Sequence, residues 1–147
     1  MLAHRGSSTI SATSLDLRLP DPRDVVWCGR GSRTYIVVTM INVVGGFAAA
    51  RPILDLLAAC MNIVAYEIEK NHDGPINGGI FDRTNTASGL SFQVLNTNNH
   101  QVTYGVLGSA LSALTDYMNR NGCGSCAFSI HDGTMQVGMG QIAMGRI

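Results

Sequence analysis

The chain has 147 residues, of which 46% are hydrophobic, and its ten basic residues balance ten acidic ones. This length predicts one domain with a sizeable core, and the balanced charge removes the clustered basic surface on which nucleic-acid binding depends. No run reaches the roughly 18 apolar residues of a membrane span, and residues 1–16 lack the apolar core of a signal peptide. We therefore expect a cytoplasmic protein, or a secreted protein whose leader has been removed.

Residues 1–23 are rich in Ser, Thr and Arg and contain two prolines. This composition predicts an N-terminal arm ahead of a single domain that spans residues 24–147. Within the arm, residues 15–19 alternate between leucine and charged side chains, as in an edge strand. Residues 34–44 are mostly β-branched and apolar at both alternating sets of positions, which predicts a central strand.

Residues 51–70 predict a long helix. Pro52 suits the first helical position, where its missing N–H costs no hydrogen bond, and apolar residues recur at steps of three and four. The apolar stripe comprises Ile53, Leu57, Cys60, Met61, Val64 and Ile68. Further apolar residues widen it until only Asp55, Asn62 and Glu69 mark a polar edge, so we expect burial on more than one side. Because one further helix is too small to cover this surface, the sequence predicts a homo-oligomer, most simply a symmetric dimer.

Residues 71–89 are dense in turn formers and form the longest candidate loop. Long loops are often functional, so this segment is the first candidate for a binding surface, with a protein or a glycan as its partner. The alternative is a plain connection that holds one short strand near Ile80. The polar residues assigned to the binding surface here are His72, Asp73, Asn77, Asp82 and Arg83.

Residues 90–96 alternate between apolar and polar side chains, which predicts a half-exposed strand. Thr103 then caps a second helix over residues 104–120, and Asn121-Gly122 ends that helix. Its core stripe comprises Val106, Leu107, Ala110, Leu111, Leu114, Tyr117 and Met118. On another side lie small residues that permit close approach of a neighbouring backbone, and these are Gly105, Gly108, Ser109 and Ser112.

Asp132-Gly133 predicts a two-residue hairpin turn. Folding the chain about this turn pairs apolar residues with each other: Ile130 with Met135, Phe128 with Val137, and Cys126 with Met139. His131 flanks the turn, where we expect a solvated side chain. The hairpin tip, residues 131–134 with His131 and Asp132, completes the predicted binding surface.

Together these elements predict an α+β fold, with two helices packed on one face of a mainly antiparallel sheet. The expected order is strand, helix, short strand, strand, helix and hairpin. This order is compatible with a split β-α-β arrangement that carries a C-terminal hairpin.

Residues 102–142 resemble a group of small, mostly uncharacterised proteins of filamentous fungi. The matching pieces are VTYGVLGSALSALTDYM, FSIHDG and VGMGQI, which form a capped helix followed by a hairpin. The resemblance is to secreted effectors and killer-toxin-like proteins of α/β-sandwich type. It implies a binding protein and supplies no catalytic residues. The chain departs from the secreted members in having no leader and only four cysteines.

The four cysteines leave the redox compartment open. Cys123 and Cys126 form a Cys-x-x-Cys motif, which can form a local disulfide, supply half of a zinc site or carry redox chemistry. No second motif supplies the remaining zinc ligands, and this motif follows a helix where redox motifs open one. Structural thiols, free or paired with Cys28, are therefore favoured, and we expect neither a metal nor a cofactor.

The sequence holds none of the common catalytic motifs of hydrolases, metalloproteases or nucleotide-binding enzymes. It therefore favours a non-catalytic recognition or assembly protein. The alternative is a small hydrolase or isomerase whose His and Asp side chains meet in space. Its acid and base would come from His72, Asp73, His100 or His131.

Overall fold

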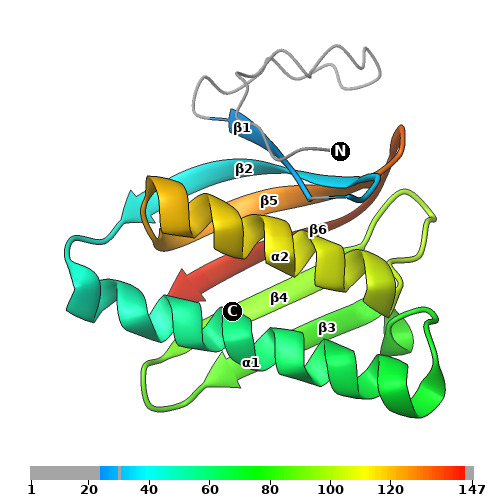
Figure 1. Ribbon diagram of the computed structural model, residues 1–147, viewed down its shortest axis with the longest axis horizontal. Helices are drawn as coiled ribbons and strands as arrows, with labels where there is room; N and C mark the ends of the chain where they lie inside the picture. Colours follow the sequence, from blue (N-terminus) through cyan, green and yellow to red (C-terminus); the bar gives the residue numbers. More distant parts are fainter. Residues whose placement is uncertain (1–23, 30, 145–147) are drawn as a thin grey trace.

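The computed structural model of the protein describes residues 24–29 and 31–144. These residues form a six-stranded sheet and two long helices (Figure 1). The elements in chain order are β1 (Asp24–Cys28), β2 (Thr34–Val43), α1 (Phe47–Asn71), the short 3-10 helix η2 (Asn77–Gly79), β3 (Ile80–Asn85), β4 (Leu90–Asn96), α2 (Tyr104–Asn121), β5 (Gly124–Asp132) and β6 (Met135–Met144). The predicted arm, with its edge strand, lies outside the described residues.

All neighbouring strands are antiparallel, and their order in the sheet is β1-β2-β5-β6-β4-β3. Helices α1 and α2 both lie on one face of this sheet, as Figure 1 shows. Strands β4 and β5 run in the same direction with β6 between them, and α2 connects them, so this part is a split β-α-β unit. The predicted α+β fold, with two helices on one face of an antiparallel sheet, is confirmed.

Helix α1 is longer than predicted, and it buries one side only. It begins at Phe47, so that Pro52 lies inside the helix and not at its start. Its buried side chains are Ile53, Leu56, Leu57, Cys60 and Val64. This stripe has the predicted spacing, and the positions around it are exposed or half-buried in the single chain. The predicted burial on further sides would need the second subunit, and it stays a prediction.

The segment Ala48–Asn71 of α1 is also long and apolar enough to cross a membrane, by length and composition alone. The prediction of no membrane span considered only uninterrupted apolar runs. Helix α1 meets the less strict criterion of mean hydropathy over a helix of sufficient length. The core helix of a globular domain passes it too. In the structure α1 packs against α2, β4 and β3, and this packing accounts for its apolar stripe.

Helix α2 forms over nearly the residues predicted for it. The Thr103 hydroxyl accepts a hydrogen bond from the Val106 N–H at 3.2 Å, which satisfies one of the unpaired donors of the first turn. Gly122 follows the last turn with a φ of 108°, a conformation that favours glycine. Both ends of this helix were therefore readable from single residues.

The β5–β6 hairpin has a different register from the one predicted. Its strands meet at the pair Asp132 and Met135, and a bulge follows between positions 130 and 131. Beyond the bulge, the helix-facing pairs are Ile130 with Gly138, Phe128 with Gly140, and Cys126 with Ile142. A slip of one residue turns every side chain of a strand to the other face. Met139, predicted to be buried, therefore points away from the helices and is 47% exposed.

This register needs glycine at two positions of β6. A Cβ atom at Gly140 would lie 2.6 Å from Cζ of Phe128, and one at Gly138 would lie 2.6 Å from Cγ2 of Val102. Both distances are shorter than any real carbon contact. Because the neighbouring side chains fill this space, β6 must present glycine where the prediction placed apolar side chains.

The predicted long loop, residues 71–89, consists largely of regular structure. Helix α1 continues to Asn71, β3 occupies Ile80–Asn85, and a short turn leads into β4. The alternative, a connection with one short strand near Ile80, describes this segment better. The long loop was a wrong prediction because the turn-forming residues belong to two short connections, 72–79 and 86–89.

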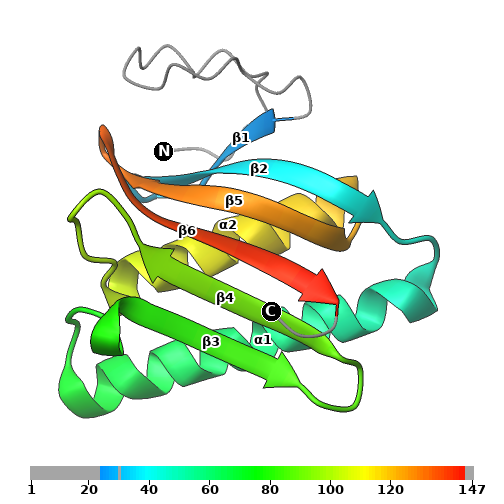
Figure 2. The same ribbon diagram turned by 180° about the vertical axis from the view of Figure 1, so that it is seen from behind.

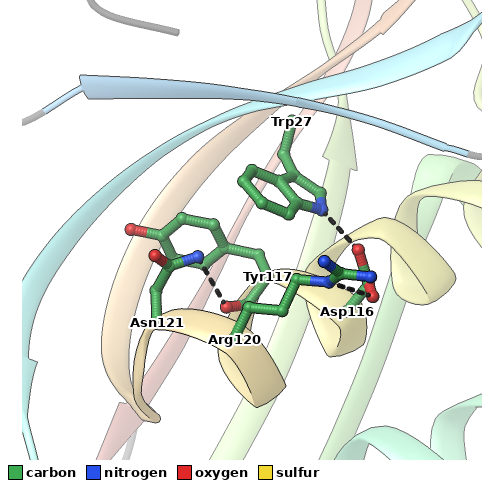
Figure 3. A network of polar contacts seen from close by, with 5 residues as sticks. All are labelled: Trp27, Asp116, Tyr117, Arg120 and Asn121. Carbon is green, nitrogen blue, oxygen red and sulfur yellow. Dashed lines mark hydrogen bonds and ion pairs between the residues drawn. The ribbon is translucent and has the colours of Figure 1, made fainter. Parts of the chain in front are cut away.

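Strand β1 was not predicted, and a polar contact with α2 fixes it (Figure 3). Trp27 Nε1 donates a hydrogen bond to Asp116 Oδ2 at 2.9 Å. The Trp27 ring packs edge-on against Tyr117, with ring centroids 5.3 Å apart. Arg120 Nε donates to the other oxygen of Asp116 at 3.0 Å. Asp116 therefore holds both the edge strand and the last turn of its own helix.

Candidate functional site

The sheet has one face that no helix of the described chain covers, and Figure 2 views the molecule from that side. Side chains alternate between the two faces along each strand, and the pairing register assigns those that point away from the helices. On the inner strands these are Tyr35, Val37 and Thr39 of β2, Ser125, Ala127, Ser129 and His131 of β5, Gln136, Met139, Gln141 and Ala143 of β6, and Ser91, Gln93 and Leu95 of β4. With Asp24, Val26 and Cys28 of β1, and Ile80, Asp82 and Thr84 of β3, they form the surface that we call the open face.

An apolar row crosses the middle of the open face. Residues paired in register line up from one edge of the sheet to the other, and these are Val26, Val37, Ser129, Met139, Leu95 and Ile80. Ser129 is the one polar member of this row. Met139 is 47% and Ile80 48% exposed. Val37 and Leu95 are half-buried, and Val26 is buried. The row therefore leaves large apolar side chains in contact with water.

The four inner strands place no Asp, Glu, Lys or Arg on the open face. Carboxylates lie only at its two edges, where Asp24 belongs to β1 and Asp82 to β3. Asp24 accepts a hydrogen bond from the Thr39 hydroxyl. A surface that is neutral in the middle and charged at the rim has the composition of a protein–protein interface, because charged residues are depleted at the core of such interfaces.

His131 lies on the open face and is half-buried. Its ring stacks on the Tyr35 ring, with centroids 4.7 Å apart, and its Nε2 lies 2.8 Å from the Ser129 Oγ. Burial lowers the pKa of His131 to about 4 and raises the pKa of Tyr35. The prediction of a solvated turn residue is therefore wrong, and His131 is a neutral member of the sheet near pH 7.

Three predicted site residues lie in the connection between α1 and β3. His72 ends α1 with a φ of 64°. Asp73 Oδ1 accepts a hydrogen bond from the Gly105 N–H at 2.8 Å, which places a negative charge at the N-terminus of α2. The Asn77 N–H donates to the Tyr104 hydroxyl at 3.4 Å. Asp73 and Asn77 thus join this connection to the start of α2, which is a role in the fold.

The remaining predicted site residues lie on strands. Asp82 and Arg83 are exposed on the edge strand β3, and they point to opposite faces. Asp132 ends β5, where its Oδ1 lies 3.9 Å from Nε of Arg33. The hairpin tip and the connection 72–79 lie at the same end of the sheet (Figure 1), but β4 lies between them. The predicted residues therefore do not gather into one site.

Cys60, Cys123 and Cys126 carry buried free thiols. Burial raises the pKa of Cys60 and that of Cys126 to about 12, so that both thiols stay protonated and are poor nucleophiles. A disulfide between Cys28 and Cys126 does not fit the register, because these residues pair with positions 35 and 40 of β2. Five residues of strand span about 16 Å, which is beyond the reach of a disulfide bond.

A groove of about 270 Å³ lies beside α2, lined by Gly29, Ser32, Gly105, Gly108, Ser109 and Ser112. The four lining residues of α2 are the small residues predicted to admit a neighbouring backbone, and Gly29 does pack close to the Ser109 carbonyl. The lining holds no titratable side chain. Within residues 24–29 and 31–144, no three His, Cys, Asp or Glu side chains gather as they would around a metal ion. We assign no chemistry to this groove.

No family model matches the chain, and no similar protein is found among curated proteins or solved structures. The assignment of the open face as the candidate site therefore rests on its geometry alone. Sequence reasoning did not find it, although a signal was present. The outward positions of β4 and β6 hold Gln93 and Gln141 where a solvated strand commonly carries Lys or Glu.

Proposed function

We propose that the protein is a non-catalytic recognition or assembly protein and that the open face is its binding surface. The observation that carries this proposal is the apolar row, which crosses the sheet without a charged residue and keeps Met139 and Ile80 about half exposed. Burying apolar surface stabilises a complex by roughly 25 cal/mol per Å². A binding role is also what the resemblance to small fungal effector-like proteins implies.

The shape of the open face favours binding over catalysis. Catalytic sites are concave, because a pocket surrounds the substrate and keeps water out, whereas the open face is one side of a sheet (Figure 2). A protein partner suits it better than a glycan. Sugars are commonly held on free aromatic rings, and the ring of Tyr35 is already stacked on His131.

The alternative function is a small hydrolase or isomerase, and the contact between Ser129 and His131 is the observation that favours it. A serine hydroxyl 2.8 Å from a histidine nitrogen has the geometry of a nucleophile beside its base. Such a base works best with a pKa near the working pH, and burial lowers the pKa of His131 to about 4. Ester turnover that disappears in a Ser129→Ala variant would support this alternative.

Site-specific photo-crosslinking tests the binding function. A benzophenone amino acid is placed at Gln141, in the middle of the open face, and in a control protein at Asn62, on the exposed side of α1. Each purified protein is irradiated alone and in an extract of the source organism. We expect protein adducts from position 141 and none from position 62. Absence of adducts at position 141 in both settings would contradict the proposal.

A further inference from the structure

We infer that the partner of the open face is a second copy of this chain, packed face to face about a two-fold axis that runs along the apolar row. This inference rests on the proposed function of the open face and adds the identity of the partner. It differs from the dimer that the sequence predicted, because that dimer would have covered α1. In the structure the buried stripe of α1 is covered by the same chain, while Met139 and Ile80 of the open face stay about half exposed.

The open face without β1 has the size of a specific interface. Val26 and Cys28 of β1 are already buried, and the other five strands, at about 4.8 Å spacing and about seven residues each, give a surface on the order of 550 Å². Two copies would bury about 1,100 Å² in total, which exceeds the roughly 1,000 Å² expected of a biological interface. Two sheets that pack face to face also form a known arrangement, with their strands aligned to within about 30°.

Two pairs of polar groups on the open face are suited to burial against an identical surface. Ser129 and His131 bond to each other, and the Thr39 hydroxyl donates to Asp24. Polar atoms that already have partners lose less on leaving water than unpaired ones. Because the inner strands present no charge, two copies meet without repulsion at their centres.

The two edge carboxylates decide the direction of the axis. Asp24 and Asp82 lie at opposite ends of the row next to the apolar row, which runs through Thr39, Ala127, Gln141 and Gln93. An axis parallel to the strands would place Asp24 opposite Asp82 of the second copy, and like charges repel strongly where water is excluded. An axis along the apolar row avoids this contact. Rotation about it places the row that contains Asp24 and Asp82 opposite the row of the second copy that contains Tyr35 and His131.

This axis predicts which residues meet. Every member of the apolar row lies opposite its own copy, so Leu95 of β4 faces the same residue of the second chain. With the axis parallel to the strands, β4 would lie over β2 instead, and Leu95 would face Val37. The two arrangements therefore differ in which cysteine pairs can form a disulfide.

Cysteine cross-linking under mild oxidation tests the inference. A Leu95→Cys variant should form a disulfide-linked dimer as its main product, and so should Val37→Cys. The wild-type protein, with its buried thiols, and a Met135→Cys variant at the hairpin tip serve as controls and should stay monomeric on a non-reducing gel. An equimolar mixture of the Leu95 and Val37 variants should give the two symmetric products and no mixed dimer.

Two results would overturn the inference. A mixed dimer that forms while both single variants stay monomeric would contradict the axis. Monomers in all samples would contradict the second copy as partner. If position 141 then forms adducts with another protein, the binding function stands and only the identity of the partner is wrong. If position 141 forms no adducts at all, the binding function fails as well.

Discussion

The two faces of the sheet are built from alternate residues of the same strands, and they serve different purposes. Under the helices the positions are filled by fully buried apolar side chains such as Ile36, Phe92 and Ile130. On the open face the same strands carry Tyr35, Gln93 and Ser129, which are half-buried. The comparison shows that burial alternates at the scale of one residue, and we propose that the outward residues are those that bind a partner.

The largest expected effect compares the two faces on a single strand. Phe92 stacks near Phe128 and Phe81, with ring centroids 5.9 and 6.0 Å away, so Phe92→Ala leaves a cavity and should lower the free energy of unfolding by about 3–5 kcal/mol. Leu95→Ala, on the open face, should cost less than about 1 kcal/mol in the monomer. Urea denaturation at low protein concentration measures both. Equal losses would show that the open face stabilises the single chain as well.

A glycine of β6 sharpens the comparison. Gly140→Ala places a methyl group 2.6 Å from the Phe128 ring and 2.6 Å from the Gln93 carbonyl oxygen, so we expect a loss of about 1–3 kcal/mol from overpacking. Gly45→Ala adds the same methyl group where nothing lies within 4 Å, and it should change stability by less than about 0.5 kcal/mol. Thermal unfolding of the two variants tests the register of β6. A Gly140→Ala protein with the stability of the wild type would mean that position 140 does not face Phe128 and that the register of β6 is wrong.

The smallest expected effect is a pH dependence that belongs to the open face. Burial lowers the pKa of His131 from 6.5 to about 4, so the unfolded chain binds more protons between these values. The stability from neutral His131 is thus present above pH 6.5 and is lost as the pH falls towards 4. His131→Gln, which keeps a polar side chain beside Ser129 and Tyr35, should remove this loss. Denaturation at several pH values compares the two proteins, and identical slopes would contradict the buried, neutral histidine.

Much of the fold follows from the sequence because single residues mark the ends of the elements. Thr103 and Gly122 bound α2, which is one residue longer than predicted, and β4, with its regular alternation, has the predicted limits. The start of α1 did not follow, because Pro52 is tolerated inside this helix. Strand β1 is short, and Trp27 anchors it to Asp116, a residue 89 positions away. The position of β1 therefore depends on a tertiary contact that a local sequence pattern does not show.

The open face was harder to predict because one bulge determines which side chains of β6 lie on it. The regular hairpin about Asp132-Gly133 would bury Met139, and the bulge beside Ile130 turns Met139 to the other face. In the observed register Gly140 leaves room for the Phe128 ring, and no local sequence pattern reveals this tertiary contact. The predicted site of turn-forming residues failed for a related reason, since Asp73 and Asn77 make contacts with the start of α2.

The most direct test of the central claim is the molar mass in solution of two matched variants. Met139 on the open face and Met135 at the hairpin tip are 47% and 46% exposed, so Met139→Lys and Met135→Lys change the same side chain at the same exposure. Light scattering at high micromolar concentration should give twice the chain mass for the wild type and for Met135→Lys, and the mass of one chain for Met139→Lys. A wild-type protein that is monomeric, or a Met139→Lys variant that remains a dimer, would contradict assembly through the open face.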